Sequence, residues 1–202
     1  MRRFVNPGNT AFEVAVNSQI YVDKTGLLAY TNSVINTKQA LICSSRPRRF
    51  GKSITADMLC AYYSRGCDSD SIFASYEIAK SDYYKKHLNQ YDVIYLDIQW
   101  CMMDAGSAEQ TVSYLNYHVI EELKEIYPQI LPDGIRTAYG AMSCINAQTG
   151  VKFIVIIDEW DVLIRDEAAN EAVLQDYINF LRGMFKGSEP TKFIALAYLT
   201  GI

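Results

Sequence analysis

Two short stretches of this chain contain residues that together could bind and cleave a phosphoanhydride. The first, residues 46–53, reads Arg-Pro-Arg-Arg-Phe-Gly-Lys-Ser and lies between an apolar stretch and a helical one. A loop of this kind binds phosphate oxygens through its backbone N–H groups and the N-terminus of the following helix. Its lysine reaches the β- and γ-phosphates, and its serine hydroxyl binds Mg²⁺. The pattern predicts that Lys52 and Ser53 bind a nucleoside triphosphate with its magnesium ion.

The head of this loop departs from the usual G-x-x-x-x-G-K-S/T pattern, because Arg46 stands where the first glycine belongs. Pro47 restricts Arg46 to extended backbone geometry, so a pre-shaped loop is still expected. The candidate nucleotide-binding residues are Arg46, Pro47, Arg48, Arg49, Phe50, Gly51, Lys52, Ser53 and Ile54. Two alternatives stay open. The first is that Gly-Lys-Ser occurs by chance at a helix N-terminus and binds no phosphate. The second concerns Arg48 and Arg49, which could be solvated surface charges, make an extra phosphate contact or contact a nucleic acid.

The second stretch, residues 153–159, reads Phe-Ile-Val-Ile-Ile-Asp-Glu, an apolar strand that ends in two adjacent carboxylates. Asp158 is predicted to hold Mg²⁺, mostly through water, beside Ser53. Glu159 is predicted to polarise the attacking water, since phosphoryl transfer to water needs a positioned base. The alternative is a strand that simply ends at the surface with charged residues. Asp161 either caps the next helical segment or supports Glu159.

A glutamate directly after the aspartate favours the additional-strand class of P-loop ATPases over GTPase-like or kinase-like relatives. In that class a further strand lies between the phosphate-loop strand and the acidic strand, and a polar residue at its tip faces the γ-phosphate. The strand at 193–199, which ends in Thr200, fits this sensor role, and it also fits a threonine that merely closes a strand. The catalytic candidates are thus Lys52, Glu159 and Thr200, and the metal candidates are Ser53 and Asp158.

Hydrophobic patterning predicts the elements that must position these residues. Short apolar runs give strands at 39–43, 93–98, 151–157 and 193–200. Amphipathic segments give helices at 24–34, 52–64, 107–127, 135–148 and 171–185, with 71–90 helical in pieces and 1–20 irregular or weakly stranded. The alternation predicts an α/β fold with a mainly parallel sheet and helices on both sides. Together with the phosphate loop and the acidic pair, this indicates a P-loop NTPase three-layer αβα sandwich of the additional-strand (ASCE or AAA-like) type, truncated after the sensor strand.

We expect one domain overall, in which an N-terminal extension over 1–36 packs on a P-loop core over 37–202. The chain stops at Ile202, close to the end of the last predicted strand, so we expect a fragment of a longer protein. Asp97 closes the second strand near the same sheet edge as the acidic pair, where it either supports the metal site or serves as a turn or cap partner. Asp23 is placed to cap the helix at 24–34.

Composition limits the classes of function. The 202 residues have a formal net charge of −4, which offers no overall basic surface for a nucleic-acid backbone. No apolar run approaches the roughly 20 residues of a membrane helix, and the N-terminus lacks the apolar stretch of a secretory signal. Five cysteines without a C-x-x-C pair favour a reducing cytoplasm and no disulfide framework. His87 and His118 show no metal-site spacing, so both are expected to be structural or surface residues.

The chain resembles the bacterial and archaeal AAA-ATPase-like family in four segments. These are Tyr21-Val22-Asp23-Lys24-Thr25, Ser45-Arg46-Pro47-Arg48-Arg49-Phe50-Gly51-Lys52-Ser53, Ile157-Asp158-Glu159-Trp160-Asp161 and Leu199-Thr200-Gly201-Ile202. The resemblance spans nearly the whole chain, and Arg46 matches the family's own form of the phosphate loop. A tyrosine often stands in the family where this chain has Trp160.

The resemblance implies ATP rather than GTP, Mg²⁺ as the metal, and a tie to DNA or mobile elements. Such proteins typically continue past Thr200-Gly201 into a helical lid region and a nuclease-like domain of the PD-(D/E)XK type. An arginine finger and a lid sensor would then lie beyond residue 202 or on a neighbouring subunit of a homo-oligomer, with Arg48 or Arg49 as weak candidates inside the chain. Segment 21–25 either contacts adenine or braces the loop, or it only caps and packs.

Three functions remain in competition at this point. The leading hypothesis is a Mg²⁺-dependent ATPase module, cytoplasmic and not bound to a membrane. The second is an ATP-binding switch or scaffold with little turnover. The third is a DNA-binding module that uses Arg46, Arg48, Arg49, Lys85 and Lys86, which the acidic charge balance disfavours for this part of the protein alone.

Overall fold

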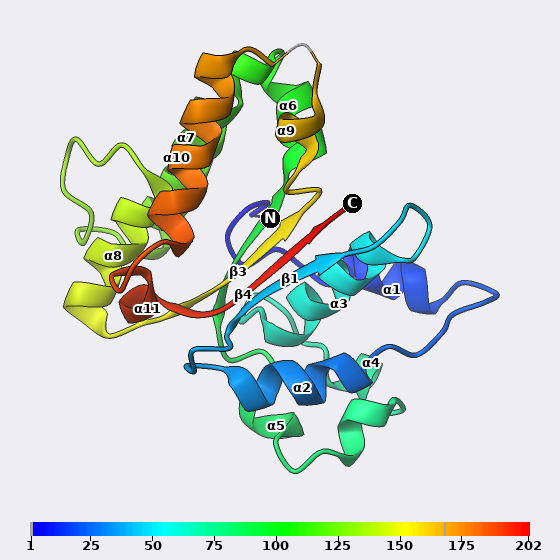
Figure 1. Cartoon of the computed structure of the whole chain (residues 1–202). Coiled ribbons are helices and arrows are strands. Elements are labelled where there is room, and N and C mark those ends of the chain that lie inside the picture. The colour runs from blue at the N-terminus through cyan, green and yellow to red at the C-terminus, as the bar shows by residue number, and fades with distance from the viewer. Residues whose placement is uncertain (1, 168) are drawn as a thin grey trace.

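The computed structural model describes residues 2–167 and 169–202. Within them, four parallel strands form the central sheet: β1 (Leu41–Ser45), β2 (Asp92–Asp97), β3 (Phe153–Asp158) and β4 (Ile194–Gly201). Their order across the sheet is β1-β4-β3-β2 (Figure 1). The predicted parallel α/β sheet is confirmed. The last strand in the chain lies between the phosphate-loop strand and the acidic strand, as the additional-strand class requires.

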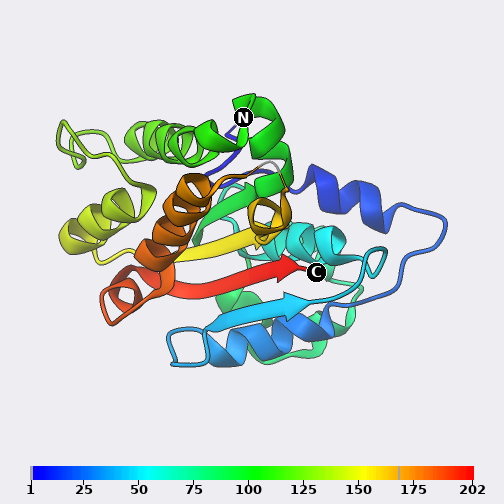
Figure 2. The same cartoon turned by 45° about the horizontal axis from the view of Figure 1, so that its top comes forward.

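Helices cover both faces of this sheet, which gives the three layers seen in Figure 2. The helices are α1 (Thr10–Val16), α2 (Gly26–Val34), α3 (Lys52–Tyr63), α4 (Asp70–Phe73), the 3-10 helix η1 (Glu77–Lys80), α5 (Tyr84–His87), α6 (Ile98–Ala105), α7 (Ala108–Ile126), α8 (Ala138–Thr149), α9 (Val162–Arg165), α10 (Glu171–Phe185) and α11 (Pro190–Phe193). The five helices expected from the sequence are all present, with ends that differ by up to three residues.

Two stretches differ from the sequence prediction because tertiary contacts decide them. Residues 1–20 include the helix α1, whose Phe12 is fully buried, so the helix is stabilised by packing rather than by a strong sequence pattern. The second strand ends at Asp97, and the apolar residues after it form α6 instead of a longer strand. The Asp97 carboxylate accepts the N–H of Trp100 at 2.9 Å and so caps α6.

The prediction that Asp23 caps the helix at 24–34 is wrong. The N-cap residue of α2 is Thr25. The Asp23 carboxylate instead accepts the N–H of Thr25 at 2.8 Å and the N–H of Glu77 at 3.0 Å. It therefore ties the entry of α2 to η1, an interaction across 54 residues that the local sequence does not show.

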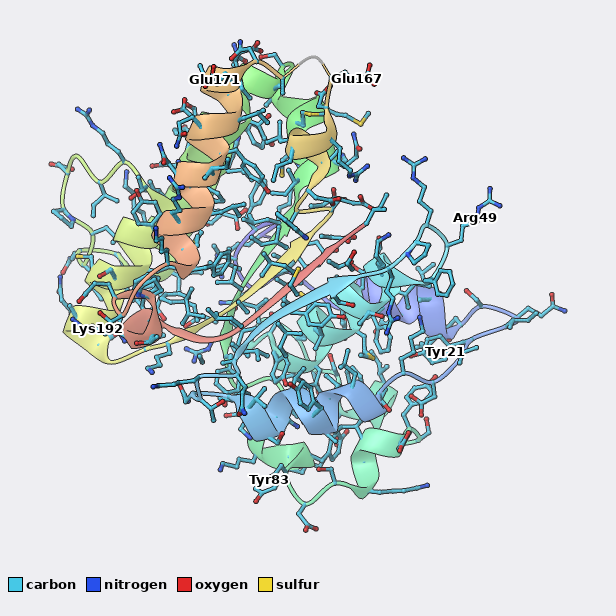
Figure 3. All side chains as sticks on the ribbon, in the orientation of Figure 1. Tyr21, Arg49, Tyr83, Glu167, Glu171 and Lys192 are labelled. Atoms are coloured by element: carbon cyan, nitrogen blue, oxygen red, sulfur yellow. The ribbon has the colours of Figure 1, made fainter. Side chains whose placement is uncertain are left out.

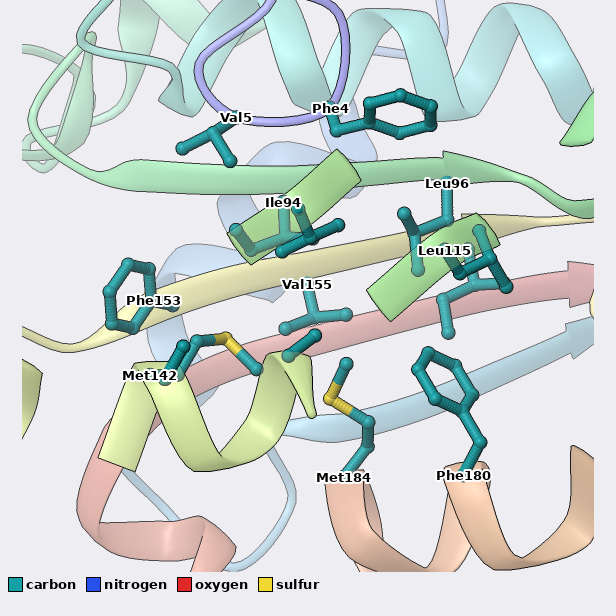
Figure 4. Packing of buried hydrophobic residues seen from close by; sticks show 14 of the residues in the cluster. Phe4, Val5, Ile94, Leu96, Leu115, Met142, Phe153, Val155, Phe180 and Met184 are labelled. Atoms are coloured by element: carbon teal, nitrogen blue, oxygen red, sulfur yellow. The ribbon is translucent and has the colours of Figure 1, made fainter. Parts of the chain in front are cut away.

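Alternate residues of β3 belong to two separate hydrophobic cores, one on each face of the sheet. Phe153, Val155 and Ile157 pack with residues of α7, α8 and α10, such as those labelled in Figure 4. Ile154 and Ile156 pack with residues of α1, α2 and α3. Successive side chains of a strand point to opposite faces, so a strand covered on both sides must be apolar throughout. Full burial of one such valine, isoleucine or phenylalanine side chain stabilises the folded state by about 1.5–3 kcal/mol.

The N-terminal segment is fixed along the free side of β2. Val5 forms an antiparallel bridge with Ile94, and the N–H of Asn6 donates to Val93 O at 2.8 Å. The Glu122 carboxylate of α7 accepts the N–H groups of residues 3, 4 and 5 at 2.9, 2.9 and 2.6 Å. Phe4 and Val5, at one end of the proposed 1–36 extension, belong to one hydrophobic core, and Val34, near its other end, belongs to the second. The division of the chain at residue 36 stays a prediction.

The strand register decides where the polar residues meet. Asp97 is paired with Asp158 across β2 and β3, and Asp158 is paired with Thr200 across β3 and β4. Thr200 is in turn paired with Ser44, one residue before the end of β1. All four therefore lie at the carboxyl edge of the sheet, where open parallel sheets bind ligands. None of the described helices is both long enough and apolar enough to cross a membrane.

One carboxylate is partly buried between α3 and β2. The Tyr95 hydroxyl donates to Asp57 Oδ1 at 3.0 Å. Burial raises the pKa of Asp57 to about 6, and the carboxylates of Asp158 and Asp97 add to the rise, whereas the hydrogen bond from Tyr95 opposes it. The folded protein therefore holds a proton on Asp57 more tightly than the unfolded chain does.

This raised pKa predicts a pH-dependent effect of Asp57→Asn on stability. Above about pH 6 the folded state must carry a partly buried charge, so the asparagine variant should be more stable by on the order of 2 kcal/mol at pH 7.5. The gain should shrink as pH falls through 6 towards 4, because the wild-type carboxyl is then protonated. Urea unfolding at several pH values measures the difference. Asp176→Asn, at an exposed position of α10, is the control, and an equal gain from both variants at every pH would contradict this account.

Candidate nucleotide site at the carboxyl edge

The loop at 46–51 connects β1 to α3 and supplies the predicted phosphate-binding backbone. The N–H of Arg46 donates to Gly201 O at 3.1 Å, which continues the pairing of β1 with β4 into the loop. The positive φ angles of the loop fall at Arg49 (70°) and at Gly51 (72°), not at Arg46. Arg46 can therefore replace the usual first glycine without left-handed backbone. Arg49 lies at the loop, with its side chain directed away from the sheet (Figure 3).

Gly51 and Lys24 fix the end of this loop. Gly51 is the N-cap residue of α3, and a Cβ placed there would lie 2.5 Å from Lys24 Nζ. Lys24 Nζ donates to Phe50 O at 2.8 Å. The 21–25 segment thus braces the loop, one of the two roles weighed for it from the sequence. The left-handed φ of 72° favours glycine at position 51, and the absence of a Cβ leaves room for the Lys24 side chain.

Lys52 lies across the mouth of the loop with only 7% of its side chain exposed. Its Nζ donates to Arg46 O at 3.0 Å and to Pro47 O at 3.3 Å. Glu159 Oε1 lies 4.0 Å from the same nitrogen. Folding therefore brings the lysine of the loop and the second acid of the distant strand within ion-pair distance.

Ser53 and Asp158 form the candidate metal site. Ser53 and Asp158 line the same cavity at the start of α3 and the end of β3. Burial raises the pKa of Asp158, the neighbouring Ser53 hydroxyl lowers it, and the nearby charge of Asp97 raises it again. A hydroxyl and a carboxylate are oxygen ligands suited to Mg²⁺, which keeps several waters and uses few protein groups. Among residues 2–167 and 169–202 no cluster of three His, Cys, Asp or Glu could hold a metal ion by itself.

Glu159 occupies an unusual backbone conformation, with φ of 52°. For a residue other than glycine this left-handed geometry costs roughly 1–2 kcal/mol. Its N–H donates to Asp158 Oδ1 at 3.0 Å, and its Oε2 accepts from Arg165 Nη2 at 3.1 Å. The side chain is 26% exposed. The strained turn after β3 thus directs the carboxylate between two cations.

Thr200 is buried at the carboxyl end of β4, with 1% of its surface exposed. Its hydroxyl has no hydrogen-bond partner among the described residues. Leaving a buried hydroxyl unpaired costs about 1–3 kcal/mol, so such a group calls for a functional explanation. The N–H of Trp160 donates to the Thr200 backbone oxygen at 3.1 Å, which holds the strand tip against the acidic loop.

A cavity of about 450 Å³ collects most of these groups. Eight of the site residues predicted from the sequence line this cavity: Arg48, Arg49, Gly51, Lys52, Ser53, Ile54, Asp158 and Glu159. Asp97 also lines it, so this residue both caps α6 and faces the site. Four residues predicted from the sequence do not line it, namely Arg46, Pro47, Phe50 and Thr200. The carbonyl oxygens of Arg46 and Pro47 accept hydrogen bonds from Lys52, which does line it. A larger cavity of about 710 Å³ lies at the opposite edge, where Lys38 is the one charged residue among its lining groups.

Two lining residues were not found from the sequence, Gln99 and Arg165. Arg165 ends the short helix α9, and its Nε donates to Asp161 Oδ2 at 2.6 Å. Asp161 takes the N-cap position of α9, as one alternative predicted, but its side chain makes no capping hydrogen bond. The only local signal was the spacing of four residues between Asp161 and Arg165, which suits an ion pair on a helix.

The other residues singled out from the sequence have structural surroundings. His87 Nδ1 lies 2.7 Å from the Tyr91 hydroxyl, and His118 stacks on Phe4 with ring centroids 5.6 Å apart. All five cysteines are free. These contacts agree with the expectation that both histidines are structural or surface residues.

Comparison with known proteins adds one finding. Residues 8–202 match the model of the family AAA-ATPase_like, which is described as "Predicted AAA-ATPase". The chain has no significant match among curated proteins or among solved structures. Because the family match covers nearly the whole chain, and because the fold and the loop geometry agree with it, the protein belongs to the AAA-ATPase-like family.

Proposed function

We propose that this chain binds ATP together with Mg²⁺ and hydrolyses it. The observation that carries the proposal is the meeting of four groups at one cavity. Lys52 Nζ lies 4.0 Å from Glu159 Oε1, and Ser53 and Asp158 line the same cavity as these two residues. The family's description supports ATP as the nucleotide.

In this proposal each residue has one task. The N–H groups of the loop, the N-terminus of α3 and the Lys52 ammonium bind the phosphates. Ser53 and Asp158 hold Mg²⁺, which when bound neutralises phosphate charge. Glu159 orients a water molecule and accepts its proton. Thr200 lies at the tip of the strand between the two motifs, and its buried hydroxyl has no partner among the described residues, which supports the sensor role.

A switch with little turnover is the second candidate, and one observation favours it. The Glu159 carboxylate is held by Arg165 at 3.1 Å and faces Lys52, so both of its oxygens are engaged by cations. A carboxylate that keeps its pair with Lys52 while ATP is bound would be slow to take a proton. The two candidates share nucleotide binding and differ only in the chemistry that follows.

A DNA-binding role finds less support. The loop at 46–51 and the helix α5 lie far apart in Figure 1, so the basic residues of the two segments do not form one surface. Lys85 is also paired with Asp70. A homo-oligomer, a nuclease-like domain beyond residue 202 and a cytoplasmic location stay predictions from the sequence.

Replacing the loop lysine tests nucleotide binding. Lys52→Ala should weaken binding of Mg²⁺–ATP by at least about tenfold, because it removes a charge-assisted contact to the phosphates. Titration calorimetry with ATP and with GTP, each with and without Mg²⁺, measures the effect. Lys186→Ala, at an exposed position after α10, is the control. Equal affinities of the Lys52→Ala variant and the wild type would argue against the loop as the phosphate site.

Replacing the second acid separates the enzyme from the switch. Glu159→Gln should keep the wild-type affinity for ATP and lower the hydrolysis rate by about 100-fold or more, since the amide cannot accept the proton. A phosphate-release assay measures the rate, with Glu125→Gln on α7 as the control. A variant that hydrolyses ATP as fast as the wild type would rule out the role of Glu159. A wild type that binds ATP without turnover would instead support the switch.

A further inference from the structure

Behind Glu159 lies a charged cluster that the proposed mechanism does not use, formed by Asp161 and Arg165. Arg165 donates to Asp161 through Nε at 2.6 Å and through Nη2 at 3.4 Å. The same Nη2 donates to Glu159 Oε2 at 3.1 Å. One guanidinium therefore joins the two carboxylates on either side of Trp160.

Asp161 has a fixed position, because β4 holds it. Its Oδ2 accepts the N–H of Ile202 at 3.2 Å. Gly201 leaves the space for this approach, since a Cβ there would lie 2.4 Å from Asp161 Oδ1. Only 8% of the Asp161 side chain is exposed. A carboxylate that is nearly buried needs charged or N–H partners, so its attachment to Arg165 is expected to persist.

The Arg165 guanidinium is well suited to transmit this position to Glu159. Its planar fork can donate to two carboxylates at once, which the single ammonium of a lysine cannot do with the same geometry. The hydrogen bond to Asp161 holds the pKa of Arg165 above its usual range, so the side chain stays charged. The Arg165 side chain is 35% exposed and also lines the 450 Å³ cavity, so it has room to move together with the Glu159 carboxylate.

Glu159 needs such a support. A free glutamate side chain has up to roughly 2 kcal/mol of conformational entropy, whereas a base must be placed within about 0.5 Å to act. The left-handed backbone of Glu159 fixes the direction of its Cα–Cβ bond but not the position of its carboxylate. The Arg165 contact is the one direct hydrogen bond from a side chain that the structure gives to the Glu159 carboxylate among the described residues.

We propose that Arg165, anchored by Asp161, is a positioning residue that places the Glu159 carboxylate for its reaction with water. The inference rests on the proposed ATPase function and goes beyond it, because it adds a residue that acts through Glu159 rather than on the nucleotide. The contrasting possibility is that the ion pair only fastens α9 to β4, in which case it affects stability and not the rate.

The test is a double-mutant cycle between Arg165 and Glu159, with kcat, KM and the ATP affinity measured for each protein. Arg165→Ala should lower kcat by about tenfold or more while the affinity for ATP stays within about twofold. In the Glu159→Gln background the same change should alter kcat by less than about twofold, because the residue through which Arg165 acts is already disabled. Arg182→Ala on α10 is the control for the loss of an exposed arginine.

Arg165→Lys keeps the inference testable if the alanine variant does not fold, as judged by thermal unfolding. It retains the charge but loses the fork, so it should lower kcat several-fold and keep the ATP affinity. A lysine variant with wild-type kcat would overturn the inference. So would an alanine variant whose effect multiplies with that of Glu159→Gln, or one that raises KM and leaves kcat unchanged.

The failure of this inference can be told from the failure of the proposed function. If the wild type hydrolyses ATP and Lys52→Ala and Glu159→Gln abolish the activity while Arg165→Ala does not change it, the proposed function stands and the positioning role is wrong. If the wild type is no more active than Lys52→Ala, the ATPase proposal fails and this role fails with it.

Discussion

The parallel register of four strands is the constraint on which the rest of the structure depends. It sets Asp97, Asp158, Thr200 and Ser44 side by side at one edge, although Ser44 and Thr200 are more than 150 residues apart in the chain. The register is itself fixed by burial, because a slip of one residue in β3 would move its side chains into the opposite core. Two hydrophobic cores thus determine the geometry of a polar site in which neither takes part.

The loops at this edge are held by a second group of interactions, mostly from lysine and arginine. Lys24 fixes the loop from the N-terminal extension, Lys52 fixes it from within, and Arg165 fixes the acidic turn. Backbone strain at Glu159 and the unpaired hydroxyl of Thr200 each cost stability. Strained and unsatisfied groups of this kind concentrate where a protein acts on a ligand, and here both lie at the carboxyl edge of the sheet.

The sequence predicted what is local and missed what depends on distant contacts. Strands, the phosphate loop and the acidic pair follow from short patterns, and the position of β4 follows from the class that a glutamate after the aspartate indicates. The helix α1 could not be predicted, since buried Phe12 stabilises it from a distant core. The partner of Asp161 was also missed, because the choice between a cap and an ion pair depends on where Gly201 and Ile202 lie in three dimensions.

The central claim is that the Lys52 loop and the Asp158–Glu159 turn share one triphosphate and its metal ion. Paramagnetic resonance of Mn²⁺ in place of Mg²⁺ tests it most directly, because coupling between the manganese spin and ³¹P shows whether protein-bound metal and phosphate are in contact. We expect protein-bound Mn²⁺ with ³¹P coupling when ATP is present, and loss of that signal in Asp158→Asn. An unchanged signal in Asp158→Asn, or bound ATP with no metal beside its phosphates, would contradict the account.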